Sequence, residues 1–253
     1  MMDLTGQLRL LVWRKLLETL RQPAWLVMGL VTPLLYLVLF APLLDKLKGA
    51  PGFTGGSVLD VFLPGLLSLL AFSSGMGAGW VVIGELDNGV IERLRVTPVS
   101  RFALLMGGVL RDVIAFVVPA VIVVAVAMPF GYHPHLAGMV ILLVLGCLLT
   151  TMISAWSAAL GIVLREIGSL AAVVTGLQLP LTLLSGVLLP IALAPAWLRG
   201  LAHADPLYYT VQASRRLSDG QIVNGAVGLG FLVTGALTVL TLAWATRTYR
   251  AAA

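Results

Sequence analysis

Charged residues are absent from five long stretches of the chain, and these stretches predict where helices cross a membrane. The stretches run over 22–44, 61–84, 113–164, 167–198 and 220–246. A helix that crosses the hydrocarbon core of a bilayer needs about 20 predominantly apolar residues. Each stretch is therefore long enough to supply at least one span.

Turn-forming residues divide the third stretch and shorten the fourth. The segment 128–134, Met-Pro-Phe-Gly-Tyr-His-Pro, interrupts the third stretch, which is too long for one crossing. Pro190 and Pro195 interrupt the fourth stretch, which exceeds one span but cannot hold two. The sequence thus predicts six transmembrane helices, near 24–44, 60–84, 102–128, 137–163, 168–189 and 222–246. The remaining piece, 190–221, is expected to be an extracellular re-entrant or lid insert, since non-helical backbone at membrane depth must be covered by protein or water.

The first residues predict a separate amphipathic helix over 3–22 that lies in the membrane interface. Its apolar positions recur every four residues, at Leu4, Leu8, Val12, Leu16 and Leu20. Arg9 and Lys15 interrupt this face, and we expect their long side chains to snorkel toward lipid phosphates. The alternative is an ordinary basic leader that only fixes topology.

Arginine and lysine are unevenly distributed between the two sides that six spans define. With a cytoplasmic N-terminus, ten basic residues fall inside and five outside. The inside set is Arg9, Arg14, Lys15, Arg21, Arg93, Arg95, Arg101, Arg165, Arg247 and Arg250, and the outside set is Lys46, Lys48, Arg199, Arg215 and Arg216. The positive-inside rule therefore predicts that both termini are cytoplasmic.

Composition supports an all-α integral membrane protein with a single transmembrane domain over 1–253. Hydrophobic residues make up 59% of the chain and charged residues only 11%, whereas an average soluble domain is about 25% charged. The single cysteine, Cys147, excludes an internal disulfide and a cysteine-rich metal site. The formal charge of +5 is explained by topology, so no nucleic-acid partner is expected.

The loop over 85–101 carries the most specific pattern in the chain. Asn88-Gly89 is a turn signal, while Val90, Ile91 and Leu94 share one helical face before Pro98 stops the helix. This pattern predicts a short amphipathic helix under the bilayer. Its apolar face indicates a docking surface for a partner protein, and a solvated charged connector is the alternative.

At this loop the sequence resembles the permease subunits of ABC-2 type transporters, a group that includes drug-efflux and polysaccharide-export permeases. The resemblance rests on an acidic residue, a glycine, a Glu-Arg-Leu run and a later proline, here Glu85, Gly89, Glu92, Arg93, Leu94 and Pro98. The insert is also similar to the proline-rich extracellular insert of drug-efflux members, through Pro190, Pro195, Trp197, Asp205 and Pro206. Asp205 stands where many relatives have Asn, and both residues cap a helix before a proline.

The resemblance implies an ABC-2 fold of the type V exporter kind, in a bacterial inner membrane. Two permease copies, identical or different, would pair, and two ATP-binding subunits would dock beneath them. ATP and Mg²⁺ would be held by those subunits and no cofactor by this chain. The ATPase-coupling residues would be Glu85, Gly89, Ile91, Glu92, Arg93, Leu94, Pro98, Arg101, Arg165 and Glu166.

The sequence positions of the lysines agree with an ATPase on a separate polypeptide. A phosphate-binding P-loop needs Gly-Lys followed by Ser or Thr. The lysines are Lys15, Lys46 and Lys48, and none of them follows a glycine. This sequence therefore contains no P-loop.

Polar residues inside the predicted spans are candidates for function or for helix contacts. Arg111 and Asp112 point about 100° apart on a helix, so each is expected to face another helix or the cytoplasmic interface and not simply its neighbour. They either couple the loop to span movement or form a structural interhelical contact. Gln178 and Thr182 are candidates for the transport path. Gly75, Gly77 and Gly79 predict close helix packing, and the three histidines predict no metal site.

The cargo is weakly determined by the sequence. Aliphatic spans and the lack of a long outer domain favour an amphiphilic, drug-like or lipid-like molecule that enters from the membrane lipid. Polysaccharide or haem-related export stays open, as does an ion-coupled carrier or channel without an ATPase. An intramembrane enzyme is disfavoured, because every histidine lies outside the spans and the spans hold only Asp60 and Asp112 as aspartates.

Overall fold

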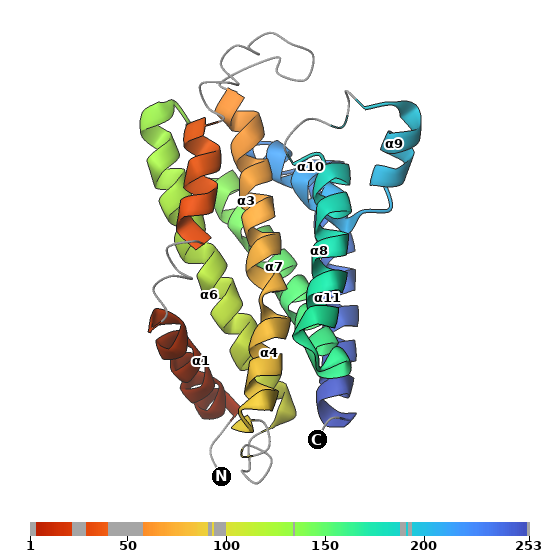
Figure 1. The fold of residues 1–253 in the computed structure, drawn as a ribbon. Helices are drawn as coiled ribbons and strands as arrows, with labels where there is room; N and C mark the ends of the chain where they lie inside the picture. The colour runs from red at the N-terminus through yellow and green to blue at the C-terminus, as the bar shows by residue number, and fades with distance from the viewer. Residues whose placement is uncertain are drawn as a thin grey trace.

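The computed structural model describes residues 4–21, 29–39, 58–90, 93, 100–133, 135–187, 191 and 194–251. Within these ranges every regular element is a helix, and the long helices form one bundle (Figure 1). Five helices are long and apolar enough to cross a membrane. They are α3 (Val58–Met76) continued by α4 (Ala78–Asp87), α6 (Arg101–Ala127), α7 (Leu136–Leu164), α8 (Ile167–Leu184) and α11 (Gly225–Ala251).

The all-helical membrane fold expected from the sequence is confirmed. A shorter apolar helix, Gly29–Leu39, lies within the first expected span, 24–44, whose ends fall outside the described residues. The fifth span ends at Leu184 and not near 189, because Ser185 and Gly186 form a turn in which Gly186 has φ 71°. The last helix continues past 246 to Ala251, which carries Arg247 and Arg250 beyond its apolar part.

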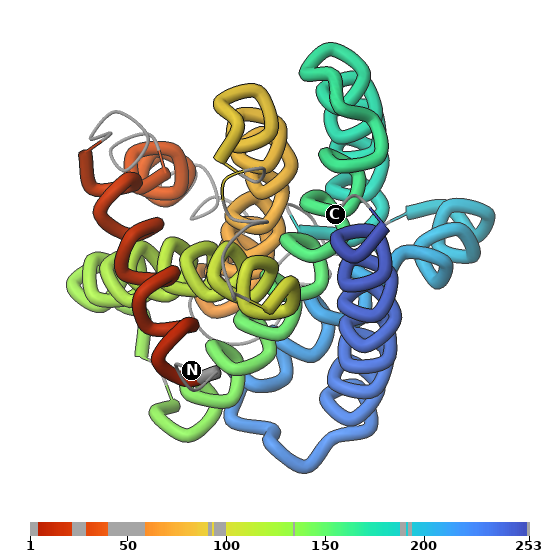
Figure 2. The backbone as a smooth tube through the Cα atoms, turned by 90° about the horizontal axis from the view of Figure 1, so that it is seen from below, coloured from red at the N-terminus to blue at the C-terminus, as the bar shows by residue number. Residues whose placement is uncertain are grey.

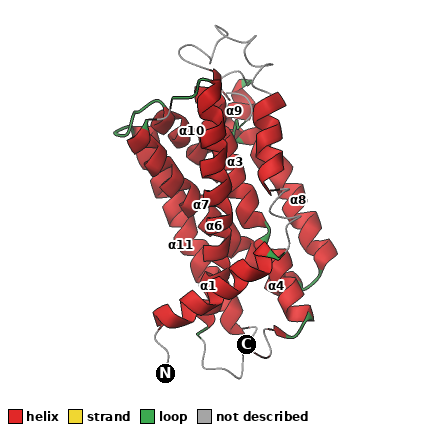
Figure 3. Cartoon of the chain, turned by 90° about the vertical axis from the view of Figure 1, so that its left-hand side faces the viewer, coloured by secondary structure: helices red, strands yellow, loops and turns green. Residues whose placement is uncertain are grey.

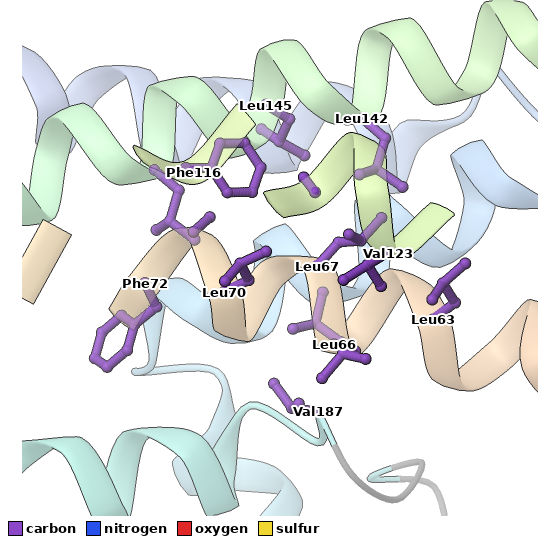
Figure 4. Packing of buried hydrophobic residues seen from close by; sticks show 14 of the residues in the cluster. Leu63, Leu66, Leu67, Leu70, Phe72, Phe116, Val123, Leu142, Leu145 and Val187 are labelled. Atoms are coloured by element: carbon purple, nitrogen blue, oxygen red, sulfur yellow. The ribbon is translucent and has the colours of Figure 1, made fainter. Parts of the chain in front are cut away.

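Helix α7 is the centre of the bundle and contacts α3, α4, α6, α10 and α11. Leu67 of α3, Phe116 of α6, and Leu142 and Leu145 of α7 are buried together in the main core (Figure 4). Small residues let the helices approach closely. A β-carbon at Gly146 would lie 2.4 Å from the Phe116 ring.

Helix α1 (Leu4–Leu20) lies beside α6 at the end of the bundle where α11 ends, at a steep angle to the long helices (Figures 2 and 3). Its buried face is formed by Leu11 and Lys15. Leu20, the last residue of the apolar face predicted from the sequence, is 61% exposed on the surface of the chain. Leu10, Trp13 and Leu17 are exposed beside it. The apolar arc of this helix is wider than one stripe, so spacing alone could not tell which part faces α6 and which part faces lipid.

The insert before α11 contains two helices, α9 (Ala196–Ala202) and α10 (Pro206–Ser218). Helix α10 packs against α3, α7 and α11, and the Ser68 hydroxyl donates to the Ser214 hydroxyl at 3.2 Å. A β-carbon at Gly138 of α7 would lie 2.0 Å from the Leu217 carbonyl oxygen. The second half of the insert over 190–221, helix α10, is therefore a packed member of the bundle.

Candidate functional site

A network of buried charges lies at the end of the bundle that holds α1. The Lys15 Nζ of α1 is 3.0 Å from both carboxylate oxygens of Glu85, near the end of α4. Lys15 is only 6% exposed. The snorkelling expected for Lys15 was thus wrong, because an acid on another helix offers its ammonium a partner inside the protein. Glu85, assigned to coupling from the sequence, contacts α1.

The second ion pair of the network joins neighbouring residues of α6. The Arg111 Nε donates to the Asp112 Oδ1 at 2.9 Å, and the Arg111 Nη2 also donates to that oxygen. The expectation that these neighbours would not pair was wrong, because the long arginine side chain folds round the helix and spans the angular offset. The other Asp112 oxygen accepts a 2.6 Å hydrogen bond from Ser154 of α7. Asp112 therefore also contacts another helix, as predicted.

The two ion pairs meet at one small cavity. Lys15, Gly108, Arg111, Ser154 and Tyr249 are among its lining residues. Tyr249, from α11, is 7% exposed. Helices α1, α4, α6, α7 and α11 thus meet around two positive and two negative charges. A buried set of this kind is stable only while each charge keeps its partner.

The loop over 85–101 begins as the sequence predicts, with a turn at Asn88-Gly89. Gly89 has φ 64°, a backbone conformation that glycine adopts without strain. The Asn88 side chain donates to the Gly84 carbonyl at 2.7 Å and so helps to end α4. Arg93 is exposed in a short helical turn. Ile91, Glu92, Leu94 and Pro98 lie outside the described residues.

The loop ends on a capped helix that also contacts α1. The Ser100 hydroxyl accepts from the Ala103 N–H at 3.1 Å and caps α6. The Ser100 N–H donates to the Gln7 side chain of α1 at 3.2 Å. Arg101 follows, with a buried Nη1 that has no hydrogen-bond partner among the described residues. Both ends of the loop are therefore attached to α1.

A two-residue turn, Arg165-Glu166, joins α7 to α8 at the same end. Arg165 has φ 54°, a left-handed conformation that residues other than glycine rarely adopt. Both side chains are exposed, and the Ser169 hydroxyl donates to Glu166. The turn therefore presents a cation and an acid on the surface.

A hydroxyl of α7 occupies the junction between α3 and α4. The Ser157 hydroxyl donates to the Met76 carbonyl at 2.6 Å and accepts from the Gly79 N–H at 3.0 Å. β-Carbons at Gly75 and Gly79 would lie 2.8 Å and 2.6 Å from α7 backbone atoms. The packing interpretation of these two glycines is confirmed, while Gly77 faces open space.

The candidate path residues lie on α8, the least covered span. Only 11% of its apolar window is buried in the chain. The Thr182 hydroxyl donates to the Gln178 carbonyl at 2.7 Å, so it is satisfied within its own helix. Both side chains are half-buried.

The insert residues are found at the opposite end of the bundle. Asp205 caps α10, as the sequence predicts, by accepting the Leu207 N–H at 2.9 Å, and Pro206 is the first helical residue. Pro195 precedes α9, and Trp197 is 67% exposed. Pro190 lies outside the described residues.

Arg215 fixes α10 to two other elements. Its guanidinium donates to the Val61 carbonyl at 3.3 Å and to the Gly186 carbonyl at 2.7 Å. Burial lowers the pKa of this side chain to about 10. Arg215 is therefore an internal anchor and not a freely exposed residue of an outer loop.

Several residues of the charge network carry no strong signal in the sequence. Ser154, Ser157 and Tyr249 are ordinary residues of apolar helices. The available signal was the recurrence of hydroxyl residues at Thr150, Ser154 and Ser157, which places them on one face of α7. Thr150 donates to the Ala71 carbonyl of α3 at 3.0 Å, so this face is the polar contact surface of the central helix.

The fold defines a multi-pass α-helical membrane protein. At the end of the bundle where α11 ends, an ion pair and a hydrogen bond connect the two ends of the 85–101 loop to α1. The profile of the ABC-2 type transporter family matches residues 6–217. The chain belongs to this family.

Named relatives cover most of the chain. The Daunorubicin resistance ABC transporter permease protein DrrB1 of Streptomyces coeruleorubidus is 26% identical over 245 residues, which are 94% of this chain and 84% of the relative. The putative transport permease ycf38 of Cyanophora paradoxa is 28% identical over 213 residues, 83% of this chain and 73% of the relative. The inner membrane transport permease YadH of Escherichia coli (strain K12) is 25% identical over 195 residues, 75% of this chain and 73% of the relative. All three are named as permeases, that is, as transport proteins.

Proposed function

We propose that the chain is the membrane-spanning permease of an ABC exporter whose ATP is hydrolysed by separate subunits docked at the loop over 85–101. One observation carries the proposal. The loop connects α4 to α6, and both helices enter the buried charge network, through Glu85 on one side and Arg111-Asp112 on the other. A docked subunit that moves the loop would therefore act directly on the ion pair that joins α1 to α4 and on the Asp112–Ser154 contact that joins α6 to α7.

The charge distribution supports a cytoplasmic position for this end of the bundle. Helix α1, the end of α4 and the end of α11 lie together there (Figure 1). Exposed basic side chains at this end include Arg93, Arg165, Arg247 and Arg250. Basic residues prefer the cytoplasmic side of a membrane.

An amphiphilic cargo that reaches the protein from the membrane is the best-supported substrate class. The described span surfaces are aliphatic, and one relative is named for daunorubicin resistance. Direct transport of a polysaccharide or of a haem-related molecule by the purified complex would replace this cargo without changing the proposed coupling.

A second permease copy is proposed to cover α8. The polar side chains of Thr175 and Gln178 lie on this span although little of it is buried within the chain. Polar side chains that face lipid are costly, and they normally face protein or a water-filled path. A partner permease packed on α8 would cover these polar side chains with protein and would enclose a path between the two copies.

Cross-linking should detect this pairing. In a Cys147→Ala background, Leu179→Cys on α8 should form a dimer with a short bifunctional thiol reagent in native membranes. Leu240→Cys on α11 is the matched control, since both leucines are 64% exposed on apolar helices. Gel mobility measures the product. Equal cross-linking at the two positions, or none at Leu179→Cys, would contradict an interface on α8.

Loop variants test the coupling. Leu94→Ala should weaken association with the ATP-binding subunit by about 5- to 150-fold, because truncating a buried apolar anchor costs about 1–3 kcal/mol. Glu92→Ala should leave the complex assembled but should uncouple ATP hydrolysis from transport. Co-purification from native membranes and cargo-stimulated hydrolysis measure the two effects. Val140→Ala, an exposed residue near the other end of α7, is the control and should be silent.

Two results would overturn the proposal. If Leu94→Ala and Glu92→Ala both match the parent in assembly and transport, the loop is not the coupling element. If the purified chain alone moves solute without any ATP-binding subunit, the protein is a carrier or channel.

A further inference from the structure

The corner between α9 and α10 holds a carboxyl group that is almost completely buried. Asp205 is 2% exposed. Its Oδ1 accepts the Leu207 N–H, while its Oδ2 is buried and has no hydrogen-bond partner among the described residues. A helix N-cap stabilises a carboxylate through the helix dipole, but a buried charged oxygen without a donor is costly.

Asp205 forms no salt bridge within the described part of the chain. The basic Arg215 of α10 is committed to backbone carbonyls. Titratable or charged groups near this end on the insert and on the elements packed against it are Asp60, Tyr132, His135, Arg199, His203, Tyr208, Tyr209, Arg215, Arg216 and Asp219.

Three aromatic residues, His203, Tyr208 and Tyr209, flank Asp205 in the sequence and contact one another. The rings of His203 and Tyr208 meet edge to face at 5.2 Å, and those of Tyr208 and Tyr209 at 5.4 Å. The Tyr209 hydroxyl donates to the His203 carbonyl at 2.9 Å, which links the end of α9 to the first turn of α10. Burial raises the pKa of the Asp205 carboxyl to about 7, although the Leu207 N–H opposes the shift.

We propose that Asp205 is a proton-binding site of the outward insert, occupied while the α9–α10 corner is packed and emptied into water when the corner opens. On opening, the O–H bond of the acid breaks and the proton passes to a water molecule. The inference goes beyond the proposed export function and rests on it only for the statement that this corner faces outward.

The direction of the pH effect follows from the two states. The packed corner favours the protonated acid, and the open corner gives the carboxyl its ordinary acidity. The equilibrium constant for opening should therefore rise by up to about tenfold per pH unit as the pH approaches 7. Above that pH it should become constant. Asparagine at this position would cap α10 without binding a proton, so Asp205→Asn is a matched control.

Infrared spectroscopy of the purified permease tests the bound proton. The carbonyl stretch of a protonated carboxylic acid should disappear as the pH is raised through about 7, and this change should be missing in Asp205→Asn. A parent spectrum in which no acid titrates near pH 7, or the same titration in Asp205→Asn, would overturn the assignment.

Thiol labelling tests the opening. In a Cys147→Ala background, Ala202→Cys reports on the packed corner, since Ala202 is fully buried, and the exposed Arg199→Cys corrects for the pH dependence of the reagent. The ratio of the two rates should rise as the outer pH is raised from about 6 to about 7, and should stay flat when Asp205→Asn is added. A flat ratio in the parent would refute pH-linked opening.

These measurements need no ATP-binding subunit. Their failure would leave the proposed export function intact, and a failure of the export function would leave the proton site intact. In sealed vesicles, a response to the inner pH alone would reverse the outward assignment of the corner.

Discussion

Asp112→Ala should lower the free energy of unfolding by about 3–5 kcal/mol, because it leaves the Arg111 guanidinium buried without its acid. Arg111 and Asp112 side chains are only 11% and 4% exposed. The substitution also removes the acceptor of the Ser154 hydroxyl and so loosens α6 from α7. Thermal or denaturant unfolding of the purified permease in detergent measures the loss.

The exposed pair Arg14–Glu18 of α1 is the control for this experiment. Its side chains are 40% and 47% exposed, so Glu18→Ala should cost less than about 1 kcal/mol. Arg111→Met combined with Asp112→Leu should recover most of the stability, since a buried pair can be replaced by apolar residues. Equal losses in Asp112→Ala and Glu18→Ala would show that the α6 pair is not buried in the membrane-embedded protein.

Gly138→Ala should destabilise the protein by about 2–3 kcal/mol through overpacking. The new β-carbon would lie 2.0 Å from the Leu217 carbonyl oxygen, so α7 and α10 must move apart. Gly228→Ala is the matched control in another apolar helix, where a β-carbon meets nothing within 4 Å. It should be neutral or should stabilise the protein by up to about 1 kcal/mol. Unfolding curves of the two variants decide the matter, and an unchanged Gly138→Ala protein would mean that α10 is not packed in the bundle.

Five of the six predicted spans coincide with long apolar helices of the described residues, because a membrane helix needs only a long apolar run, which is a local property. The cap at Asp205-Pro206 and the turn at Gly89 were also predictable, since both depend on neighbouring residues. The ion-pair partners of the charged residues were not predictable from the sequence. Lys15 and Glu85 are 70 positions apart, and nothing in their local patterns relates them.

The packing of α10 shows the same limit. Its segment contains three polar residues in a row, Ser214-Arg215-Arg216, which is typical of an exposed outer loop. Ser214 is nevertheless buried, and Arg215 donates to the carbonyl of Val61 in α3 and to that of Gly186, which follows α8. Ile91, Glu92, Leu94 and Pro98 stay predictions of the docking surface.

The Ser157 hydroxyl also determines how force would travel along the second span. Because α7 supplies hydrogen-bond partners to Met76 and Gly79 at the α3–α4 junction, the bending stiffness there depends on a neighbouring helix as well as on the span itself. A movement of α4 relative to α3 would therefore bend the span at the point where it contacts α7. A torque applied where α4 ends would load the central helix before it reached the outer half of the span.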